Sequence, residues 1–450
     1  MRAENGNKSV NRRTLLQAAA LGAAAAATGG REALGAGTAT TASRPARRRT
    51  NQSGTSISVL VPSFQSIGDG FMRDQAAEFE AETGISVEMQ FLPFERAMDR
   101  QATLVAAQSG EVDVFGTHYA QIGKFGEGMV PLNELAAKDG IEADQYVGNS
   151  FDFLTVDGKL LAIPFTFDLR TLFYRTDLFE AAGIEAPPAT WDEFIATAQA
   201  VNQPPDVYGF ITVGKGDPAL REFADRLWEC GGDFLEDGMN PSAPIWNQDA
   251  GVEALTFMRD LIWEYKVSPE GTPSYGWEEN AQLFAAGQGV MSKQWDPAAT
   301  QDPAQSVIIG NYSVARLPTY KTGRSNALCH ARGINRYSEK QDAAWEYVKF
   351  VTSEDQLFKF FELAGNRPAN LAALARAGES AEGVVKQNLE VSLEQAKEGY
   401  DWPHFAQFAE VQPILWGEIE RVLSRQKEPK EALDFAAEQA IEIFKRDGII

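Results

Sequence analysis

A regular alternation of strand and helix patterns between residues 56 and 115 most narrowly limits the fold of this chain. Residues 56–61 (SISVLV) are rich in β-branched and aliphatic side chains and end at Pro62. The apolar spacing then changes repeatedly between the helical period of 3.6 and the strand period of two. The expected elements are a strand, a helix, a strand, a helix and a strand, at 56–61, 71–82, 85–91, 95–107 and 112–115. Strands separated by helices usually pair in parallel, so this segment predicts an α/β lobe with a largely parallel sheet.

The same α/β pattern recurs further along the chain. Strands are expected at 160–164, 171–174 and 208–212, and helices at 217–229, 249–265, 342–351, 353–364, 406–424 and 429–445. Thr190 and Glu193 predict a capping box, in which the Thr190 hydroxyl accepts from the Glu193 amide and the Glu193 carboxylate accepts from the Thr190 amide. Gly84 and Gly365 stand where helix-ending glycines belong. Two α/β lobes followed by helical crossings between them are the expected fold class.

Charge is distributed unevenly along the chain. Residues 1–50 carry nine basic and two acidic residues (+7), which leaves 32 basic and 61 acidic residues (−29) in 51–450. A field of that sign repels nucleic acid and anionic lipid headgroups, so we expect no nucleic-acid partner. No stretch after the first 30 residues approaches 18 apolar residues, so we expect the mature part to be soluble.

The N-terminal segment has the pattern of an export signal. Arg12 and Arg13 precede the apolar run 18–28 (AAALGAAAAAT), which is too short to span a membrane as a helix. The pattern resembles a twin-arginine (Tat) signal, in which the arginine pair is read by a receptor. Small-residue cleavage sites occur within 33–42, and the composition of residues 29–55 is typical of a processing segment or linker. No cysteine follows the apolar run, so the sequence does not support a lipid anchor at that point. We therefore expect residues 1–55 to be a leader and linker, and the protein to be exported to the periplasm or cell surface.

Cysteine and histidine are too few for a disulfide scaffold or a metal site. Cys230 and Cys329 lie 99 residues apart in sequence, which leaves both a single bridge and two free thiols open. His118, His330 and His404 have no spacing that would place two metal ligands on one helix. We expect neither a metal nor another cofactor.

A block of about 40 residues carries a specific resemblance. It contains DGKLLAIP at 157–164, FDLRTLFY at 167–174, DLF at 177–179, AGI at 182–184 and PPATWDEF at 187–194. In this order the motifs resemble the family 1 extracellular solute-binding proteins of ABC importers, a group that includes the maltose-binding proteins. Weaker similarities extend the match to about residues 56–443, among them LFAAGQGVM at 283–291 and AAWEYVKF at 343–350.

The resemblance implies a type II periplasmic-binding-protein fold, with two lobes joined by a hinge and a ligand cleft between them. Lobe 1 would comprise 56–165 and about 326–372, and lobe 2 about 166–315 and 373–450. It further implies a non-enzymatic, monomeric protein that captures a carbohydrate and docks on a membrane ABC permease.

Carbohydrates have apolar C–H faces and rings of hydroxyls, so their sites combine aromatic planes with carboxylates, amides and arginine. Several loop positions of the chain have that chemistry. The candidate ligand-binding residues are Phe64, Gln65, His118, Tyr119, Phe167, Asp168, Arg170, Trp277, Trp295, Asp296, Arg332 and Trp402. Trp295 follows an expected strand end, where the family often places a stacking aromatic residue. Asp168 and Arg170 could form a structural ion pair with each other, or they could bind the ligand from a loop near the hinge; the sequence favours the two roles about equally.

Two other functions remain open at this point. The same fold could bind a polyamine or glycerol-phosphate, although the phosphate-binding GxGxxG and P-loop patterns do not occur. A secreted glycan hydrolase would need paired carboxylates, and a chain with 63 acidic residues supplies such pairs by chance. Neither a GxSxG nor an HExxH motif is present.

Overall fold

The computed structural model describes residues 54–450, apart from 64, 149, 239, 296–303, 305, 401 and 404. The described residues belong to one compact unit. The expected export signal lies outside the described residues, as do Phe64 and Asp296, and the side chain of Gln65 is likewise not described.

The first sheet contains six strands in the described part of the chain, in the order β12-β11-β3-β1-β2, with β6 beside β11. Its strands are β1 (Ser56–Pro62), β2 (Ser86–Leu92), β3 (Val114–His118), β6 (Ile163–Leu169), β11 (Ser325–Ile334) and β12 (Gly399–Tyr400). β1 pairs in parallel with β2 and β3, as the alternating pattern predicts, whereas β11 is antiparallel to β3 and β6. Val59, Leu60 and Val61 are all buried because helices cover both faces of this sheet.

The second sheet has the order β10-β7-β9-β8. Its strands are β7 (Thr171–Arg175), β8 (Tyr208–Ile211), β9 (Gly289–Gln294) and β10 (Tyr312–Ala315), and β4 (Thr155–Val156) with β5 (Lys159–Leu160) forms a separate hairpin. β8 and β9 are parallel, and the other two pairs are antiparallel.

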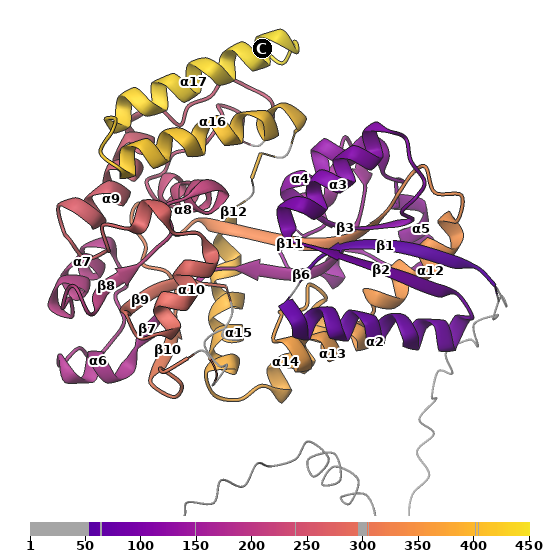
Figure 1. The fold of residues 1–450 in the computed structure, drawn as a ribbon, viewed down its shortest axis with the longest axis horizontal. Coiled ribbons are helices and arrows are strands. Elements are labelled where there is room, and N and C mark those ends of the chain that lie inside the picture. Colours follow the sequence, from indigo (N-terminus) through magenta and orange to yellow (C-terminus); the bar gives the residue numbers. More distant parts are fainter. Residues whose placement is uncertain are drawn as a thin grey trace, which may run out of the picture. The chain divides into compact units, whose positions relative to one another are not determined.

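Helices pack on both sheets (Figure 1). In the first lobe these are α2 (Gln65–Thr83), α3 (Phe94–Ala106), α4 (Tyr119–Phe125), α5 (Asn133–Asp139), α12 (Gln341–Val351), α13 (Glu354–Ala364) and α14 (Leu371–Ser380). Around the second sheet lie α6 (Thr176–Ala181), α7 (Trp191–Ala200), α8 (Gly216–Glu229), α9 (Asp249–Trp263), α10 (Trp277–Ala285), α15 (Gly383–Gln395), α16 (Ala406–Leu423) and α17 (Pro429–Arg446). The 3₁₀ turns are η1 (Gly126–Gly128), η2 (Ala143–Gln145), η3 (Asp152–Leu154), η4 (Thr272–Ser274) and η5 (Ala396–Glu398).

The chain passes from the first sheet to the second directly after the end of β6. A single residue, Arg170, separates the end of β6 from the start of β7. The segment after α13 runs beside β6, because the Phe167 amide donates to the Arg367 carbonyl (3.0 Å) and the Ala369 amide to the Phe165 carbonyl (3.2 Å). The structure thus has the two-lobed α/β fold that the sequence predicts.

Three local expectations change. The Thr190 hydroxyl accepts from the Glu193 amide (3.3 Å), but the Glu193 carboxylate accepts from the amide of Ala189 (2.8 Å), one residue before the predicted partner. α2 begins at Gln65, six residues before the expected start. Cys230 and Cys329 are both buried and do not form a disulfide bridge, which decides between the two open alternatives. Gly84 (φ 77°) and Gly365 (φ 75°) do have the left-handed conformation expected at helix ends.

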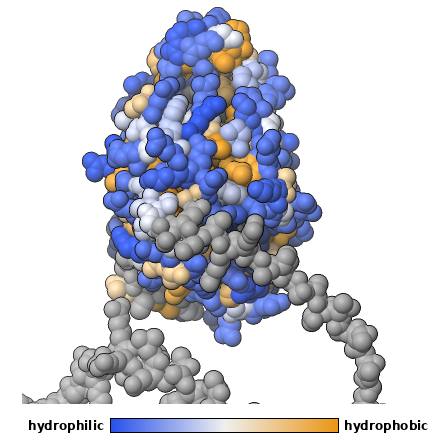
Figure 2. All heavy atoms as spheres, turned by 90° about the vertical axis from the view of Figure 1, so that its right-hand side faces the viewer, coloured by the Kyte–Doolittle hydropathy of each residue, from blue (hydrophilic) through white to orange (hydrophobic). Residues whose placement is uncertain are grey.

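The surface visible in Figure 2 is mostly hydrophilic. On the face shown in Figure 2, hydrophilic residues cover most of the surface and hydrophobic ones form small separate areas. None of the helices within the described ranges is long and apolar enough to cross a membrane.

Candidate functional site

A pocket of about 270 Å³ is lined by residues from both lobes. The lining residues are Phe94, His118, Asp168, Asp217, Arg221, Trp277, Trp295, Leu328, His330 and Asn366. The first lobe contributes the ends of β3 and β6, the middle of β11, the start of α3 and the segment after α13, and the second contributes the starts of α8 and α10 and the residue after β9. The pocket therefore lies where strand ends and helix starts of the two lobes meet.

Two tryptophans form the aromatic wall of the pocket. Trp277 is the first residue of α10 and Trp295 directly follows β9, and their rings meet edge to face with centroids 5.5 Å apart. The guanidinium of Arg170 lies 5.0 Å from the ring centroid of Trp277 and 5.5 Å from that of Trp295. The guanidinium of Arg367 also donates to the Trp295 carbonyl (2.7 Å) and the Leu169 carbonyl (2.8 Å). These contacts hold the rings in a fixed arrangement.

Two histidines form part of the opposite wall. His118 and His330 face each other directly in the antiparallel pairing of β3 and β11, with ring centroids 5.0 Å apart. Burial lowers the pKa of His118 well below its usual value, and electrostatic interactions with His330 and Arg221 lower it further. Burial also lowers the pKa of His330 to about 3, with a further contribution from Arg332. Both imidazoles are therefore neutral at ordinary pH.

The polar groups of the pocket come from Asp168, Asp217, Arg221 and Asn366. The Thr166 hydroxyl donates to the Asp168 carboxylate (2.8 Å). Asp217 and Arg221 lie one turn apart on α8 and form an ion pair (3.2 Å). Arg221 also donates to the hydroxyl of Tyr119 (2.8 Å), so this guanidinium links α8 of the second lobe to α4 of the first.

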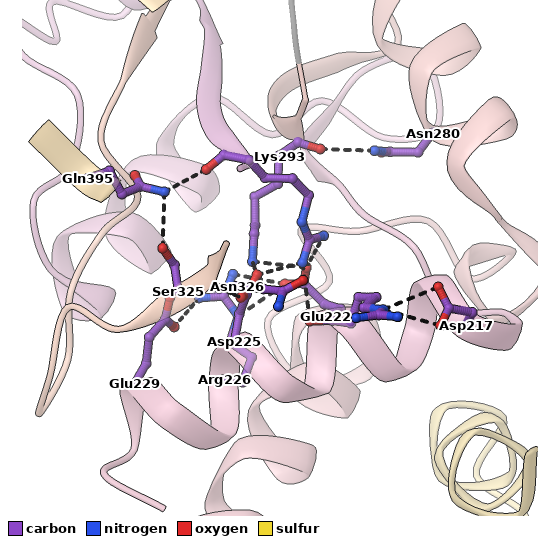
Figure 3. Close-up of polar contacts among 12 residues, drawn as sticks. Asp217, Glu222, Asp225, Arg226, Glu229, Asn280, Lys293, Ser325, Asn326 and Gln395 are labelled. Carbon is purple, nitrogen blue, oxygen red and sulfur yellow. Dashed lines mark hydrogen bonds and ion pairs between the residues drawn. The ribbon is translucent and has the colours of Figure 1, made fainter. Parts of the chain in front are cut away.

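A buried cluster of three basic and three acidic side chains includes Arg170, which contacts both tryptophan rings. Figure 3 shows polar contacts of this cluster. Arg170 binds Glu222 (2.9 Å) and Asp225 (2.5 Å), and Lys293 binds the same two carboxylates (3.0 and 2.7 Å). On α8 itself, Arg226 binds Glu222 (2.9 Å) and Glu229 (2.6 Å).

The two glutamates of this cluster have opposite pKa shifts. Burial alone would raise the pKa of Glu222, but Lys293, Arg226 and Arg170 together lower it. Burial raises the pKa of Glu229 to about 7, against the attraction of Arg226. The basic and acidic side chains of the cluster engage one another, so we interpret the cluster as a structural support of the pocket.

Four predicted ligand residues line the pocket: His118, Asp168, Trp277 and Trp295. Tyr119 lies next to it as the partner of Arg221, and Trp402 is fully buried with that guanidinium 4.0 Å from its ring centroid. Phe167 is buried in the hydrophobic core.

The two remaining arginines among the predicted ligand residues do not line the pocket. Arg170 neither forms an ion pair with Asp168 nor lines the pocket, because its guanidinium binds the carboxylates of Glu222 and Asp225 on α8. Arg332 is buried in the first lobe, 3.9 Å from the ring centroid of Phe165.

Sequence reasoning missed six residues that line the pocket: Phe94, Asp217, Arg221, Leu328, His330 and Asn366. The i, i+4 spacing of Asp217 and Arg221 on an expected helix was the one available signal. The position of His330 in the pocket depends on the register between β3 and β11, which no local sequence pattern predicts.

A larger hollow of about 740 Å³ lies where α8 ends and α9 begins. Its lining includes Gly231, Asn247, Arg324 and Lys430 but no aromatic side chain. Lys430 is already paired with Asp434 (2.5 Å), so this hollow lacks the chemistry of a built ligand site.

The two-lobed fold, with a pocket lined from both lobes, defines the class of solute-binding proteins that take up a small molecule between their lobes. Residues 62–358 match the model of the bacterial extracellular solute-binding protein family, and the chain belongs to this family. Its members bind a small solute outside the cytoplasm and deliver it to an ABC permease, and they are not enzymes.

Individual proteins agree with this assignment. A probable ABC transporter-binding protein of Deinococcus radiodurans is 28% identical over 309 residues, which cover 65% of this chain and 71% of the relative. The maltose-bound MalE3 protein of T. maritima has a TM-score of 0.77 at 27% identity, covering 86% of this chain and all of that protein. A solute-binding protein from Agrobacterium radiobacter in complex with ribitol has a TM-score of 0.76 at 23% identity, covering 87% of this chain and 99% of that one.

Proposed function

We propose that the protein captures an uncharged carbohydrate, a monosaccharide, short oligosaccharide or polyol, in the pocket between its lobes and delivers it to an ABC permease. The observation that carries this proposal is the placement of Trp277 and Trp295 in one pocket with Asp168, Asp217 and Asn366. Indole faces cover the C–H face of a carbohydrate, and the polar side chains bind its hydroxyls. Maltose, bound by the similar MalE3 protein, belongs to this class of solutes.

The size of the pocket supports a compact solute. Pockets for small molecules usually measure about 300–1,000 Å³, and the volume of about 270 Å³ lies just below this range. One or two sugar units, or a linear polyol, suit this space better than a long oligosaccharide.

The charges of the site favour an uncharged solute over a polyamine. Arg170 already lies against both indole rings, which weakens their attraction for a second cation. One of the two carboxylates in the lining, Asp217, is neutralised by Arg221. A polyamine would need free carboxylates and free ring faces.

A phosphate ester is disfavoured for the opposite reason. Arg221 is the single guanidinium in the lining that the described residues provide, and Asp217 and Tyr119 both engage it. Tight phosphate binding favours several unengaged arginines or a free helix N-terminus.

We also infer that the protein has no catalytic activity, because Asp168 and Asp217 serve here as partners of Thr166 and Arg221.

The proposal includes export and domain motion. Arg12, Arg13 and the short apolar run after them support a Tat leader. We propose that the two lobes close on the solute as rigid bodies in a monomeric protein. The predicted bounds, 56–165 with 326–372 and 166–315 with 373–450, are adjusted here so that all of β6 and α14 belong to the first lobe. The single-residue crossing at Arg170 supports a hinge at that place.

A thermal-shift screen tests the proposed class of solute. The panel is maltose, D-mannitol, ribitol, glycerol 3-phosphate and spermidine, each at 5 mM with the mature protein. A solute present at a hundred times its Kd adds about 2.7 kcal/mol to the free energy of unfolding, which raises Tm by several degrees. We expect a rise with at least one uncharged carbohydrate and none with the two charged compounds. A rise with spermidine or glycerol 3-phosphate alone would remove the carbohydrate assignment.

A further inference from the structure

The paired histidines of β3 and β11 bring to the pocket neutral side chains that can both donate and accept hydrogen bonds, which its tryptophans and carboxylates do not. His118 and His330 both line the pocket, directly opposite each other in the strand pairing. Side chains at directly opposed positions of an antiparallel pair project from the same face of the sheet. The two imidazoles therefore reach the pocket together from one rigid strand pair.

Packing fixes the orientation of both rings. Phe94 meets each imidazole edge to face, with centroids 5.2 Å from His118 and 6.1 Å from His330 and interplanar angles of 87° and 88°. Phe94 is the first residue of α3, which packs against the first sheet. Rings held in this way have little conformational freedom left to lose when a ligand binds.

The hydrogen bonding of His118 indicates which ring nitrogen carries the proton. Its Nδ1 atom is enclosed and has no hydrogen-bond partner in the described part of the chain. A neutral imidazole has one protonated and one unprotonated nitrogen, and an enclosed N–H without an acceptor costs more than an enclosed lone pair. The proton of His118 therefore belongs on Nε2, which makes this nitrogen a hydrogen-bond donor.

We propose that His118 and His330 form a specificity-determining pair that hydrogen-bonds two neighbouring oxygen atoms of the captured carbohydrate. This inference rests on the proposed function and adds to it the residues that recognise hydroxyl groups from the first lobe. Neutral imidazoles suit hydroxyls, because both groups can donate and accept. The pair also selects against cations, since neither ring contributes a negative charge.

Burial, together with charged neighbours, keeps the pair neutral at neutral pH. Arg221 on α8 faces His118, and Arg332 on β11 acts on His330, while Asp168 on β6 and Asp217 on α8 complete the lining. Burial and the two arginines lower the pKa of both imidazoles despite the carboxylates. The pair therefore keeps its hydrogen-bonding pattern at neutral pH.

Long-range ¹H–¹⁵N NMR of the imidazoles tests the inference in the unaltered protein. The chain has three histidines, so the spectrum is simple, and His404→Gln identifies the third signal. Maltose and D-mannitol are added separately, and the indole signal of Trp295 serves as an internal reporter of binding. We expect the signals of His118, His330 and Trp295 to shift together with at least one of these probes.

The other outcomes separate this inference from the proposed function. A shift of the Trp295 indole without any shift of either imidazole would overturn the histidine pair and leave carbohydrate binding intact. No shift of any of the three signals with either probe would count against carbohydrate capture and, with it, against the histidine pair.

Matched variants give the size of the effect. His118→Phe and His330→Phe keep an aromatic ring against Phe94 and remove the ring nitrogens. Each is expected to weaken the Kd of the responding probe about tenfold, the value of one net hydrogen bond. Tyr320→Phe is the control, because it removes a hydrogen bond to Glu253 (2.8 Å) outside the pocket lining. Unchanged affinity in both histidine variants would contradict the pair, as would an affinity of the wild type that falls with a midpoint near pH 6.5.

Discussion

The guanidinium of Arg170 lies 5.0 Å from the ring centroid of Trp277 and also binds two carboxylates of α8, those of Glu222 and Asp225. The aromatic wall of the pocket therefore rests on a buried ion cluster. Removing one member of such a cluster leaves an uncompensated buried charge, whereas the intact cluster roughly balances its desolvation cost. This arrangement connects the stability of the second lobe to the geometry of ligand capture.

Arg170→Met is expected to destabilise the protein by about 3–5 kcal/mol, because Glu222 and Asp225 lose a buried partner. Arg170→Lys should restore part of this loss, since it keeps the charge. Urea unfolding followed by circular dichroism measures the change. Arg100→Met, which breaks the exposed pair with Glu111, is the control and should cost at most about 1 kcal/mol. Equal losses in Arg170→Met and Arg100→Met would refute the structural role of the cluster.

Trp295→Ala is expected to lower carbohydrate affinity about thirtyfold, corresponding to about 2 kcal/mol of lost apolar contact. The side chain lies at the rim of the pocket, half-buried, so the fold should persist. Isothermal titration with the carbohydrate that responds in the thermal-shift screen measures the effect. Trp263→Phe is the matched control, because that indole donates to the Leu423 carbonyl (2.8 Å) and does not line the pocket. Equal affinities of wild type and Trp295→Ala would remove Trp295 from the site.

The histidine pair gives a defined dependence of stability on pH. The folded pKa of His330, about 3, is far below the value of about 6.5 for an unfolded histidine. The unfolded chain therefore binds more protons below pH 6.5, and the contribution of this group is present above pH 6.5 and is lost as pH falls from 6.5 towards 3. The slope is about 1.4 kcal/mol per pH unit for each imidazole.

Comparison of wild type with His330→Phe isolates this contribution. Glu229, with its pKa raised to about 7, acts in the opposite direction between pH 4.5 and 7, but it is common to both proteins. The free energy of unfolding of wild type, measured relative to the variant, should decrease from pH 7 to pH 4.5. A constant difference over that interval would show that His330 is not held neutral in the folded protein.

Arg12→Lys combined with Arg13→Lys is expected to block export, because a Tat receptor reads the arginine pair rather than its charge. Expression of the full chain followed by cell fractionation measures the outcome. The precursor should accumulate in the cytoplasm, while Lys8→Arg, which leaves the pair intact, should be exported normally. Normal export of the double variant would contradict a twin-arginine signal.

Local sequence patterns predicted several elements of the first lobe closely. Strand β1 was placed to within one residue, and α3 and β2 likewise, because their apolar periodicity is strong and both faces of the sheet are covered. Helices α14 and α15, at 371–395, were not predicted. Few large apolar residues mark this segment, and its helices are stabilised by packing against α13 and β10.

The site could be predicted only in part. Trp295 and Asp168 follow from their position at strand ends and from the family resemblance. The role of Arg170 could not be predicted, since its partners lie 52 and 55 residues away on a helix whose orientation no sequence pattern specifies. His330 enters the pocket through the register of an antiparallel pair whose strands are about 200 residues apart in sequence.

A crystal structure of the mature protein with the carbohydrate that gives the largest thermal shift tests capture between the lobes most directly. We predict that the carbohydrate lies against Trp295 and Trp277, with a hydroxyl within hydrogen-bonding distance of Asp168 and with the histidine pair on the opposite side. A carbohydrate bound in the hollow near Gly231, or a charged solute retained in the pocket in its place, would contradict the account.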